Sequence, residues 1–370
     1  MTTAFDPLVL GRALLANRIV MAPMSRARAY GPDACPHPSA KLYYEQRASA
    51  GLIVTEGIQP SPGARGYPAT PGLHTQTQVE AWREVTDAVH AAGSVIFAQL
   101  MHAGRIGHPS LLPPAAQPVG PSAVTAGATI VTRDGPLACV LPRALTEDDI
   151  AAIVDDFAVA ARNAIRAGFD GVELHGANGF LVHQFLSANA NLRTDRYGAT
   201  VEGRIRFAVE VVTALADAVG ADRVGLQISP GNPHNDIVEP DQPELYGALV
   251  DALAGTGLAY LSVTEGDRSL TEQLRGRWPG LFMLNPRTSP RPTGPEDLAL
   301  VADGTTDLLS FGALFLANPD LPRRLAEGGP FNPPDRATFY GGGDRGYTDY
   351  PALDGKAAES TVPASDVRCL

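Results

Sequence analysis

Two hydrogen-bonding side chains, those of His175 and Asn178, stand three residues apart in one short segment. The segment follows an apolar run, and Gly176 and Gly179 allow its backbone to turn tightly. An imidazole and an amide that converge from one loop suit an oxygen atom that becomes negative during a reaction. The pattern predicts oxyanion stabilisation, with a purely structural role for both residues as the alternative.

Further polar residues stand at the ends of other apolar runs. The first run ends in Ala22-Pro23-Met24-Ser25, the second in Thr55-Glu56-Gly57 and the third in Gln99-Leu100-Met101-His102. Taken singly, a polar residue at a strand end is more often an ordinary loop contact than a ligand. If the runs are barrel strands, however, their carboxyl ends meet at the one face where such barrels place their active sites.

Eight short runs rich in Val, Ile and Leu supply those strands. They are residues 17–24, 51–57, 94–100, 171–176, 224–229, 259–265, 281–285 and 307–312. Continuous apolar runs are typical of parallel strands buried on both faces, and their alternation with helices indicates right-handed crossovers. We therefore predict an α/β fold, a (β/α)8 TIM barrel. No Gly-x-Gly-x-x-Gly follows any run, which counts against a Rossmann domain.

Two of the intervening helices have clear end signals. A helix that ends near Ala167 begins after Thr146 with an acidic first turn, and Gly168 stops it. A second helix is expected over residues 202–220, by the same kind of pattern.

The chain is expected to form a single domain, with a barrel over residues 1–353 and a disordered tail over residues 354–370. Pro and Gly concentrate between residues 104 and 142, which predicts a long excursion after the third strand with a small hairpin near residues 128–133. The tail is polar and rich in small residues.

Composition restricts the function classes. The 370 residues are 44% hydrophobic and 19% charged, with a formal net charge of −11 and no block of like charges. This balance argues against a nucleic-acid or membrane partner and favours a small-molecule substrate. Three cysteines without metal-ligand spacing predict neither a disulfide framework nor a metal site, and a start without signal-peptide character predicts a cytoplasmic protein.

Several ordered motifs resemble the old yellow enzyme family. They are residues 17–24 (NRIVMAPM), 99–105 (QLMHAGR), 172–186 (VELHGANGFLVHQFL), 193–198 (RTDRYG) and 339–351 (FYGGGDRGYTDYP). The similarity extends from about Pro7 to Leu353.

The resemblance implies an FMN-dependent oxidoreductase in which NAD(P)H reduces the flavin and the flavin passes hydride to an electron-poor alkene. It implies that His175 and Asn178 grip the substrate carbonyl. The substrate cavity would be lined by Tyr67, Phe180 and Tyr347. The cofactor would be held by Pro23, Met24, Ser25, Gly57, Gln99, Gln227, Gly312 and Ala313.

Four positions depart from the family pattern. Phe180 stands where most members have a proton-donating Tyr, and a phenyl ring has no proton to give. Gln227 replaces an Arg that faces the flavin N1 and O2, and Ala313 replaces the Arg of a Phe-Gly-Arg motif. Pro286 removes a backbone donor from the turn after the seventh strand, where Arg287 or Arg291 would be the substitute cations.

These departures leave three functions to distinguish. The first is NAD(P)H-dependent, FMN-dependent reduction of an enone, enal or related molecule, with Tyr67, another tyrosine or water as the proton source. The second is flavin-dependent isomerisation of an unsaturated carbonyl compound, since related isomerising members carry Phe at this place. The third is a flavin-free barrel that catalyses a cyclisation or rearrangement.

Overall fold

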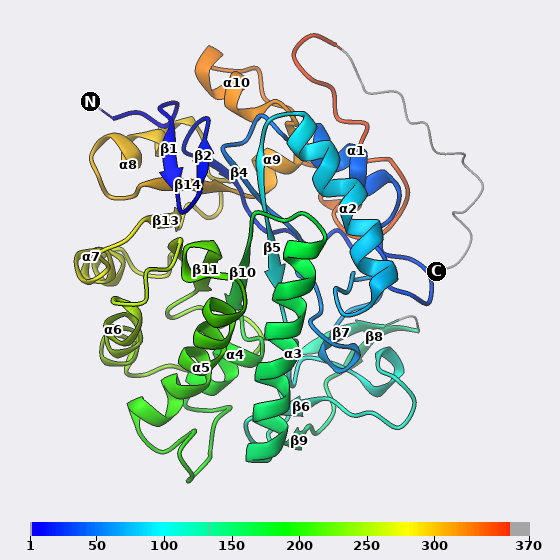
Figure 1. The fold of residues 1–370 in the computed structure, drawn as a ribbon, viewed down its shortest axis with the longest axis vertical. Coiled ribbons are helices and arrows are strands. Elements are labelled where there is room, and N and C mark those ends of the chain that lie inside the picture. Colours follow the sequence, from blue (N-terminus) through cyan, green and yellow to red (C-terminus); the bar gives the residue numbers. More distant parts are fainter. Residues whose placement is uncertain (1, 133, 356–370) are drawn as a thin grey trace.

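The computed structural model describes residues 2–132 and 134–355, and its centre is a closed barrel of eight parallel strands (Figure 1). In barrel order the strands are β3 (Ile19–Met21), β4 (Leu52–Val54), β5 (Val95–Leu100), β10 (Gly171–Gly176), β11 (Val224–Ile228), β12 (Tyr260–Thr264), β13 (Phe282–Asn285) and β14 (Leu308–Phe311). Each lies within one of the eight runs predicted from the sequence. The TIM barrel is confirmed.

The strand residues alternate between two apolar environments. Outward side chains such as Val172 and Leu174 belong to the large core between the strands and the helices. Inward side chains at the amino-terminal end, among them Val20 and Phe97, form a second core with Leu10 and Leu15. Those leucines come from the hairpin of β1 (Leu8–Leu10) and β2 (Ala13–Leu15), which closes that end of the barrel. The opposite end is thereby left for the functional site.

The helices surround the barrel, and the two predicted from capping signals are present. They are α3 (Glu147–Arg166) and α5 (Val201–Val219), capped by Thr146 and Thr200. The other helices are α1 (Ser39–Glu45), α2 (Gln76–Ala91), α4 (Leu181–Leu186), α6 (Gln242–Leu253), α7 (Arg268–Arg277), α8 (Ala299–Ala302), α9 (Ala313–Ala317) and α10 (Leu321–Glu327). Short 3₁₀ turns occur at Pro62–Ala64, Pro109–Leu111, Ala221–Arg223, Pro295–Leu298 and Arg336–Thr338.

The predicted excursion after β5 carries four short strands. They are β6 (Val119–Gly120), β7 (Thr129–Thr132), β8 (Gly135–Ala138) and β9 (Arg143–Ala144). β7 and β8 form the expected antiparallel hairpin, and β6 pairs with β9. In Figure 1 these strands lie at the end of the barrel opposite the β1–β2 hairpin. The excursion therefore covers the end where the strands finish.

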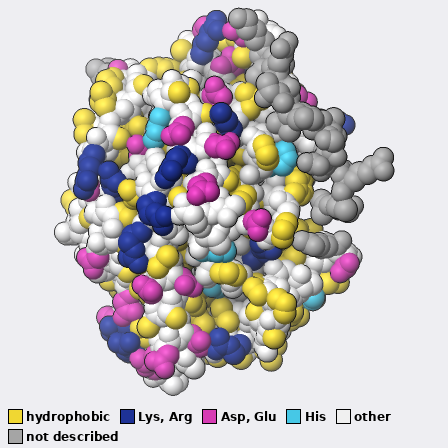
Figure 2. Space-filling view, turned by 45° about the vertical axis from the view of Figure 1, so that its right-hand side comes forward, with side chains coloured by type: hydrophobic (Ala, Val, Ile, Leu, Met, Phe, Trp, Pro, Cys, Tyr) yellow, Lys and Arg dark blue, Asp and Glu magenta, His cyan; other side chains and the backbone are white. Residues whose placement is uncertain are grey.

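The surface of the described residues carries mixed charge. Figure 2 shows acidic and basic side chains interspersed over the visible face. No helix in residues 2–132 or 134–355 combines the length and apolar character needed to cross a membrane. Most of the predicted disordered tail, residues 356–370, lies outside the described residues.

Candidate active site

The carboxyl ends of three neighbouring strands bring together three of the predicted site residues. The parallel register sets His175 of β10 beside Gln227 of β11, and Gln99 of β5 beside Glu173 of β10. The side chain of Gln99 also contacts that of Gln227, with its Nε2 3.0 Å from the Gln227 Oε1. Residues separated by up to 128 positions in the chain thus form one cluster inside the barrel mouth.

His175 is held as a neutral imidazole with a defined tautomer. Burial lowers its pKa to about 3. Its Nδ1 accepts a hydrogen bond from the backbone N–H of Ala177 at 3.2 Å, so this nitrogen carries no hydrogen. The hydrogen of the neutral ring must then be on Nε2. His175 is therefore a hydrogen-bond donor through Nε2 over the whole physiological pH range.

Asn178 follows His175 in a left-handed backbone conformation, with φ of 54°. Its backbone N–H donates to the Ser229 hydroxyl at 2.9 Å, and its carbonyl accepts from the side chain of Asn235 at 2.8 Å. Its side-chain Oδ1 accepts from the Nδ2 of Asn232, also at 2.8 Å. The loop after β11 therefore supplies three contacts to this one residue.

Aromatic rings continue the site away from His175. The ring of Phe180 meets that of His175 edge to face at 5.0 Å, and the ring of Tyr67 meets Phe180 in the same way at 6.2 Å. Phe180 and Tyr67 also pack with Met101 and other apolar residues of the excursion. Burial raises the pKa of Tyr67 to about 12, so its phenol keeps its proton. His175, Phe180 and Tyr67 thus form a row of three rings beneath the excursion.

The structure does not bring Tyr347 to this row. Its ring stacks on Tyr43 at 4.2 Å and lies under the guanidinium of Arg28 at 4.4 Å, and it is 1% exposed. Tyr340, which is 69% exposed, instead interacts electrostatically with the Tyr67 phenol. Tyr340, which lies in the run FYGGG, is therefore a candidate lining residue that the sequence pattern did not single out. The buried stack explains why Tyr347 is unsuited to line a cavity.

A second residue that the sequence prediction did not include is Glu173, which lies two residues before His175 on β10. Its carboxylate accepts from Gln99 Nε2 at 2.8 Å and from the Tyr260 hydroxyl at 3.0 Å. Burial raises the pKa of Glu173 to about 7. The sequence feature that could have identified Glu173 is the presence of a charged residue within an apolar strand.

The Gln99 and Gln227 amides suit the ring of the FMN that the resemblance implies. Because Gln99 uses Nε2 as a donor to Glu173 and Gln227, its Oε1 is left as an acceptor. Gln227 accepts through Oε1 and is left with its Nε2 as a donor. The pyrimidine edge of a flavin alternates carbonyl oxygens with N–H groups, which an acceptor beside a donor can match. The two amides therefore fit the flavin ring, but they supply no positive charge to it.

The predicted contacts from β3 and β4 also have the character of a cofactor cradle. Pro23, Met24 and Ser25 follow β3 and are partly exposed, and Gly57 follows β4. A Cβ at Gly57 would lie 2.9 Å from the Met101 Sδ, so a larger residue there would require the Met101 side chain to move. Within the part of the chain that the structure describes, the Gly57 N–H has no hydrogen-bond partner. That free donor would be available to a bound ring.

The loops after β13 and β14, where barrels of this type frequently bind phosphate, offer few free cations. Arg287 donates to the carbonyl of Gly266, and Arg291 is paired with Asp297 and Glu296. Gly312 and Ala313 begin α9 there and are partly exposed. Arg291 is thus committed to carboxylates, whereas Arg287 is exposed, has no ion pair among the described residues and remains the candidate to replace the family's phosphate-binding Arg.

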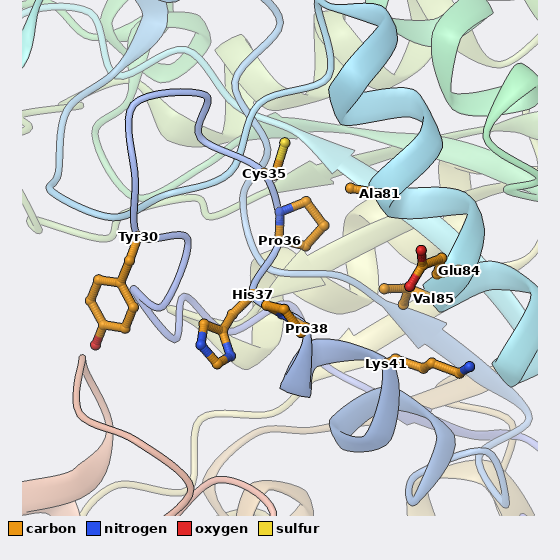
Figure 3. Close-up of a pocket in the computed structure, with 9 residues that line it drawn as sticks. All are labelled: Tyr30, Cys35, Pro36, His37, Pro38, Lys41, Ala81, Glu84 and Val85. Carbon is orange, nitrogen blue, oxygen red and sulfur yellow. The ribbon is translucent and has the colours of Figure 1, made fainter. Parts of the chain in front are cut away.

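A surface pocket of about 290 Å³ lies away from this cluster, between the loop before α1 and the face of α2 (Figure 3). Its lining includes Tyr30, Cys35, His37, Lys41 and Glu84. None of the predicted site residues contributes to it. No group of three or more His, Cys, Asp or Glu suited to a metal ion occurs among the described residues.

Comparison with known proteins agrees with the geometry. The sequence model of the NADH:flavin oxidoreductase / NADH oxidase family matches residues 3–332. The chain is 42% identical to putative 12-oxophytodienoate reductase 2 of Oryza sativa subsp. japonica over 369 residues, 96% of each protein. It is also 42% identical to a chanoclavine-I aldehyde reductase of Penicillium roqueforti over 363 residues, covering 95% of this chain and 96% of that one.

Solved structures lead to the same family. Morphinone reductase in complex with tetrahydroNAD superposes with a TM-score of 0.90 at 42% identity, covering 96% of this chain and 98% of that one. The old yellow enzyme homologue of Zymomonas mobilis superposes with a TM-score of 0.91 at 37% identity, covering 95% and 100%. The chain belongs to the old yellow enzyme family and is an FMN-dependent oxidoreductase that uses a nicotinamide reductant.

Proposed function

We propose that the enzyme reduces a small α,β-unsaturated carbonyl compound whose carbonyl oxygen is bound by His175 and Asn178 together. The observation that carries the proposal is the fixed direction of the donors. Ala177 holds the His175 Nδ1, and Asn232 holds the Asn178 Oδ1, which leaves the Nε2–H and the Nδ2–H groups for a ligand. Two preorganised donors suit an oxygen on which negative charge develops.

The chemistry divides between the cofactor and the side chains. FMN, once reduced by NAD(P)H, supplies the hydride. Gln99, Gln227 and Gly57 are proposed to hold the flavin ring, with Pro23, Met24 and Ser25 along its side and Gly312 and Ala313 toward its phosphate. His175 and Asn178 draw electron density toward the carbonyl oxygen, which makes the alkene more electrophilic. Losing one such donor typically costs about 2.7–4 kcal/mol of transition-state stabilisation.

Net reduction also needs a proton at the α-carbon, and Phe180 has none to give. Tyr67 is the phenol whose ring packs against Phe180, and its raised pKa keeps it protonated at neutral pH. We propose that Tyr67 delivers this proton, directly or through one water molecule. Tyr340, exposed beside Tyr67, is proposed to line the outer part of the cavity.

Isomerisation is the second candidate, and Phe180 is the observation that favours it. Without a proton at the α-carbon, rotation about the Cα–Cβ bond before the hydride returns to the flavin would convert an acyclic substrate into its geometric isomer. The flavin-free alternative loses its support, because the chain matches a flavin-dependent family over most of its length.

One experiment separates these functions. Purified protein is examined for a flavin absorption spectrum and is then given NADPH without oxygen and either 2-cyclohexenone or the acyclic enal (Z)-3,7-dimethylocta-2,6-dienal. Reduction predicts one NADPH consumed for each cyclohexanone formed. Conversion of the Z enal into its E isomer without stoichiometric NADPH consumption would assign isomerisation, and a colourless protein that FMN cannot reconstitute would refute both flavin-dependent functions.

A further inference from the structure

We propose that Asn232, in the loop after β11, is a positioning residue that decides whether Asn178 presents a donor or an acceptor to the ligand. The inference rests on the proposed role of Asn178 in binding the carbonyl oxygen. Asn232, in the loop of residues 229–239, thereby sets the hydrogen-bonding preference of the site through Asn178.

The direction of the Asn178 amide follows from a backbone group. The N–H of His234 donates to the Asn232 Oδ1 at 3.0 Å, and a backbone N–H cannot act as an acceptor. The Asn232 Oδ1 is therefore the acceptor end of its amide, and the Nδ2 is the donor end. That Nδ2 donates to the Asn178 Oδ1 at 2.8 Å. Asn178 is left with its own Nδ2 hydrogens for the ligand.

The same loop fixes the backbone of Asn178. Ser229 accepts its N–H, and Asn235 donates to its carbonyl. The next residue, Gly179, packs against the loop so closely that a Cβ there would lie 2.6 Å from both the His234 carbonyl oxygen and the Asn235 Cβ. Backbone and side chain of Asn178 are thus both constrained from one element.

A buried cluster anchors the loop at its far end. The Glu239 carboxylate accepts from the Gly231 N–H and the Tyr246 hydroxyl, and it also contacts the His183 Nε2 at 3.0 Å. The His183 Nδ1 accepts from the N–H of Gly179 at 3.0 Å. Glu239, Tyr246 and His183 are each at most 6% exposed. They connect the loop to the residue next to Asn178, so the two segments are held in one arrangement.

The carboxylate variant Asn232→Asp reverses the expected direction. A carboxylate only accepts, so one oxygen would take the His234 N–H and the other would require a donor from Asn178. The Asn178 amide would turn over and present its Oδ1 to the ligand. The site would then favour a ligand hydroxyl over a ligand carbonyl.

The test measures the dissociation constants of 2-cyclohexenone and 2-cyclohexenol from their perturbation of the flavin spectrum in oxidised holoenzyme. These ligands have nearly the same size, but only the alcohol can donate. We expect Asn232→Asp to raise the ratio of the enone to the alcohol dissociation constant tenfold or more. His234→Asp is the matched control, because it puts the same charge on an exposed side chain of the loop and keeps the backbone N–H. It should leave the ratio unchanged.

Two further variants make the outcomes distinct. Asn232→Ala frees the Asn178 amide to rotate, so it should raise the ratio of the enone to the alcohol dissociation constant about threefold. This variant still tests the positioning role if Asn232→Asp does not fold. Asn178→Ala should weaken enone binding. If Asn178→Ala weakens enone binding but neither change at Asn232 moves the ratio, the positioning role is overturned while the proposed function stands. If Asn178→Ala has no effect, the proposed role of Asn178 fails, and the positioning role fails with it.

Discussion

The imidazole of His175 meets the phenyl ring of Phe180 edge to face, with ring centroids 5.0 Å apart and an interplanar angle of 85°. Phe180, which has no transferable proton, therefore stands directly beside the proposed carbonyl clamp, which is the pair His175 and Asn178. The edge-to-face contact with the phenyl ring stabilises the position of the imidazole. The proton for the α-carbon must then come from another group.

Replacing Phe180 with Tyr should increase net reduction of 2-cyclohexenone by roughly tenfold or more, because it adds a general acid beside the clamp. The measurement is cyclohexanone formed per NADPH consumed, in wild type and variant loaded equally with FMN. Phe180→Leu, which adds no proton, should show no gain. Equal rates in the Tyr variant and the wild type would mean that Phe180 does not limit reduction.

Replacing Tyr67 with Phe should lower the rate of net reduction about tenfold, since water would remain as a slower proton source. The measurement is kcat for cyclohexanone formation. Tyr350→Phe is a suitable control, because the one hydrogen bond of the Tyr350 hydroxyl among the described residues is accepted from the exposed N–H of Asp335. An unchanged kcat in Tyr67→Phe would remove Tyr67 as the proton source.

The strength of the carbonyl clamp should not vary between pH 5 and pH 9. Burial lowers the pKa of His175 to about 3, so the ring becomes charged only in strong acid. The pKa of Tyr67 is raised to about 12, so the phenol ionises only in strong base. The dissociation constant of 2-cyclohexenone, measured across this range, should stay constant. A step near pH 6.5 would show that His175 titrates normally and is less buried than the structure indicates.

Replacing Glu173 with Gln should stabilise the protein above pH 7. Glu173 ionises near pH 4.5 when unfolded and near pH 7 when folded, because burial raises its pKa. The folded state therefore binds the extra proton, and this contribution to stability is lost as the pH rises from about 4.5 to 7. The variant should gain up to about 3 kcal/mol over wild type at pH 7.5, and less at pH 4.5.

Urea unfolding at the two pH values measures this difference. Glu272→Gln, at an exposed position, is the control and should behave like the wild type. A Glu173→Gln variant that loses stability at pH 7.5 would show that the carboxylate is better paired than its contacts with Gln99 and Tyr260 suggest.

The sequence was sufficient to predict the barrel because the signals are local. Apolar runs such as residues 171–176 and the Thr146 cap depend only on nearby residues, and the structure has these elements within a residue or two. The placement of His175 and Gln99 in one mouth followed from the general rule for strand ends.

The rest of the site depends on contacts between distant segments. Asn232 and Asn235 act on Asn178 from more than 50 positions away, and no local pattern marks them as partners. Tyr347 and Tyr340 lie in one Gly-rich segment, and only packing against Tyr43 shows which of them is buried. Sequence spacing alone could not choose between these two tyrosines.

The most direct test of the central claim is the kcat/KM for 2-cyclohexenone with NADPH, in wild type and His175→Ala loaded equally with FMN. If His175 donates to the developing oxyanion, the variant should lose roughly 10²–10³ in kcat/KM. A value within threefold of the wild type would contradict the assignment of His175 and Asn178 as the carbonyl clamp.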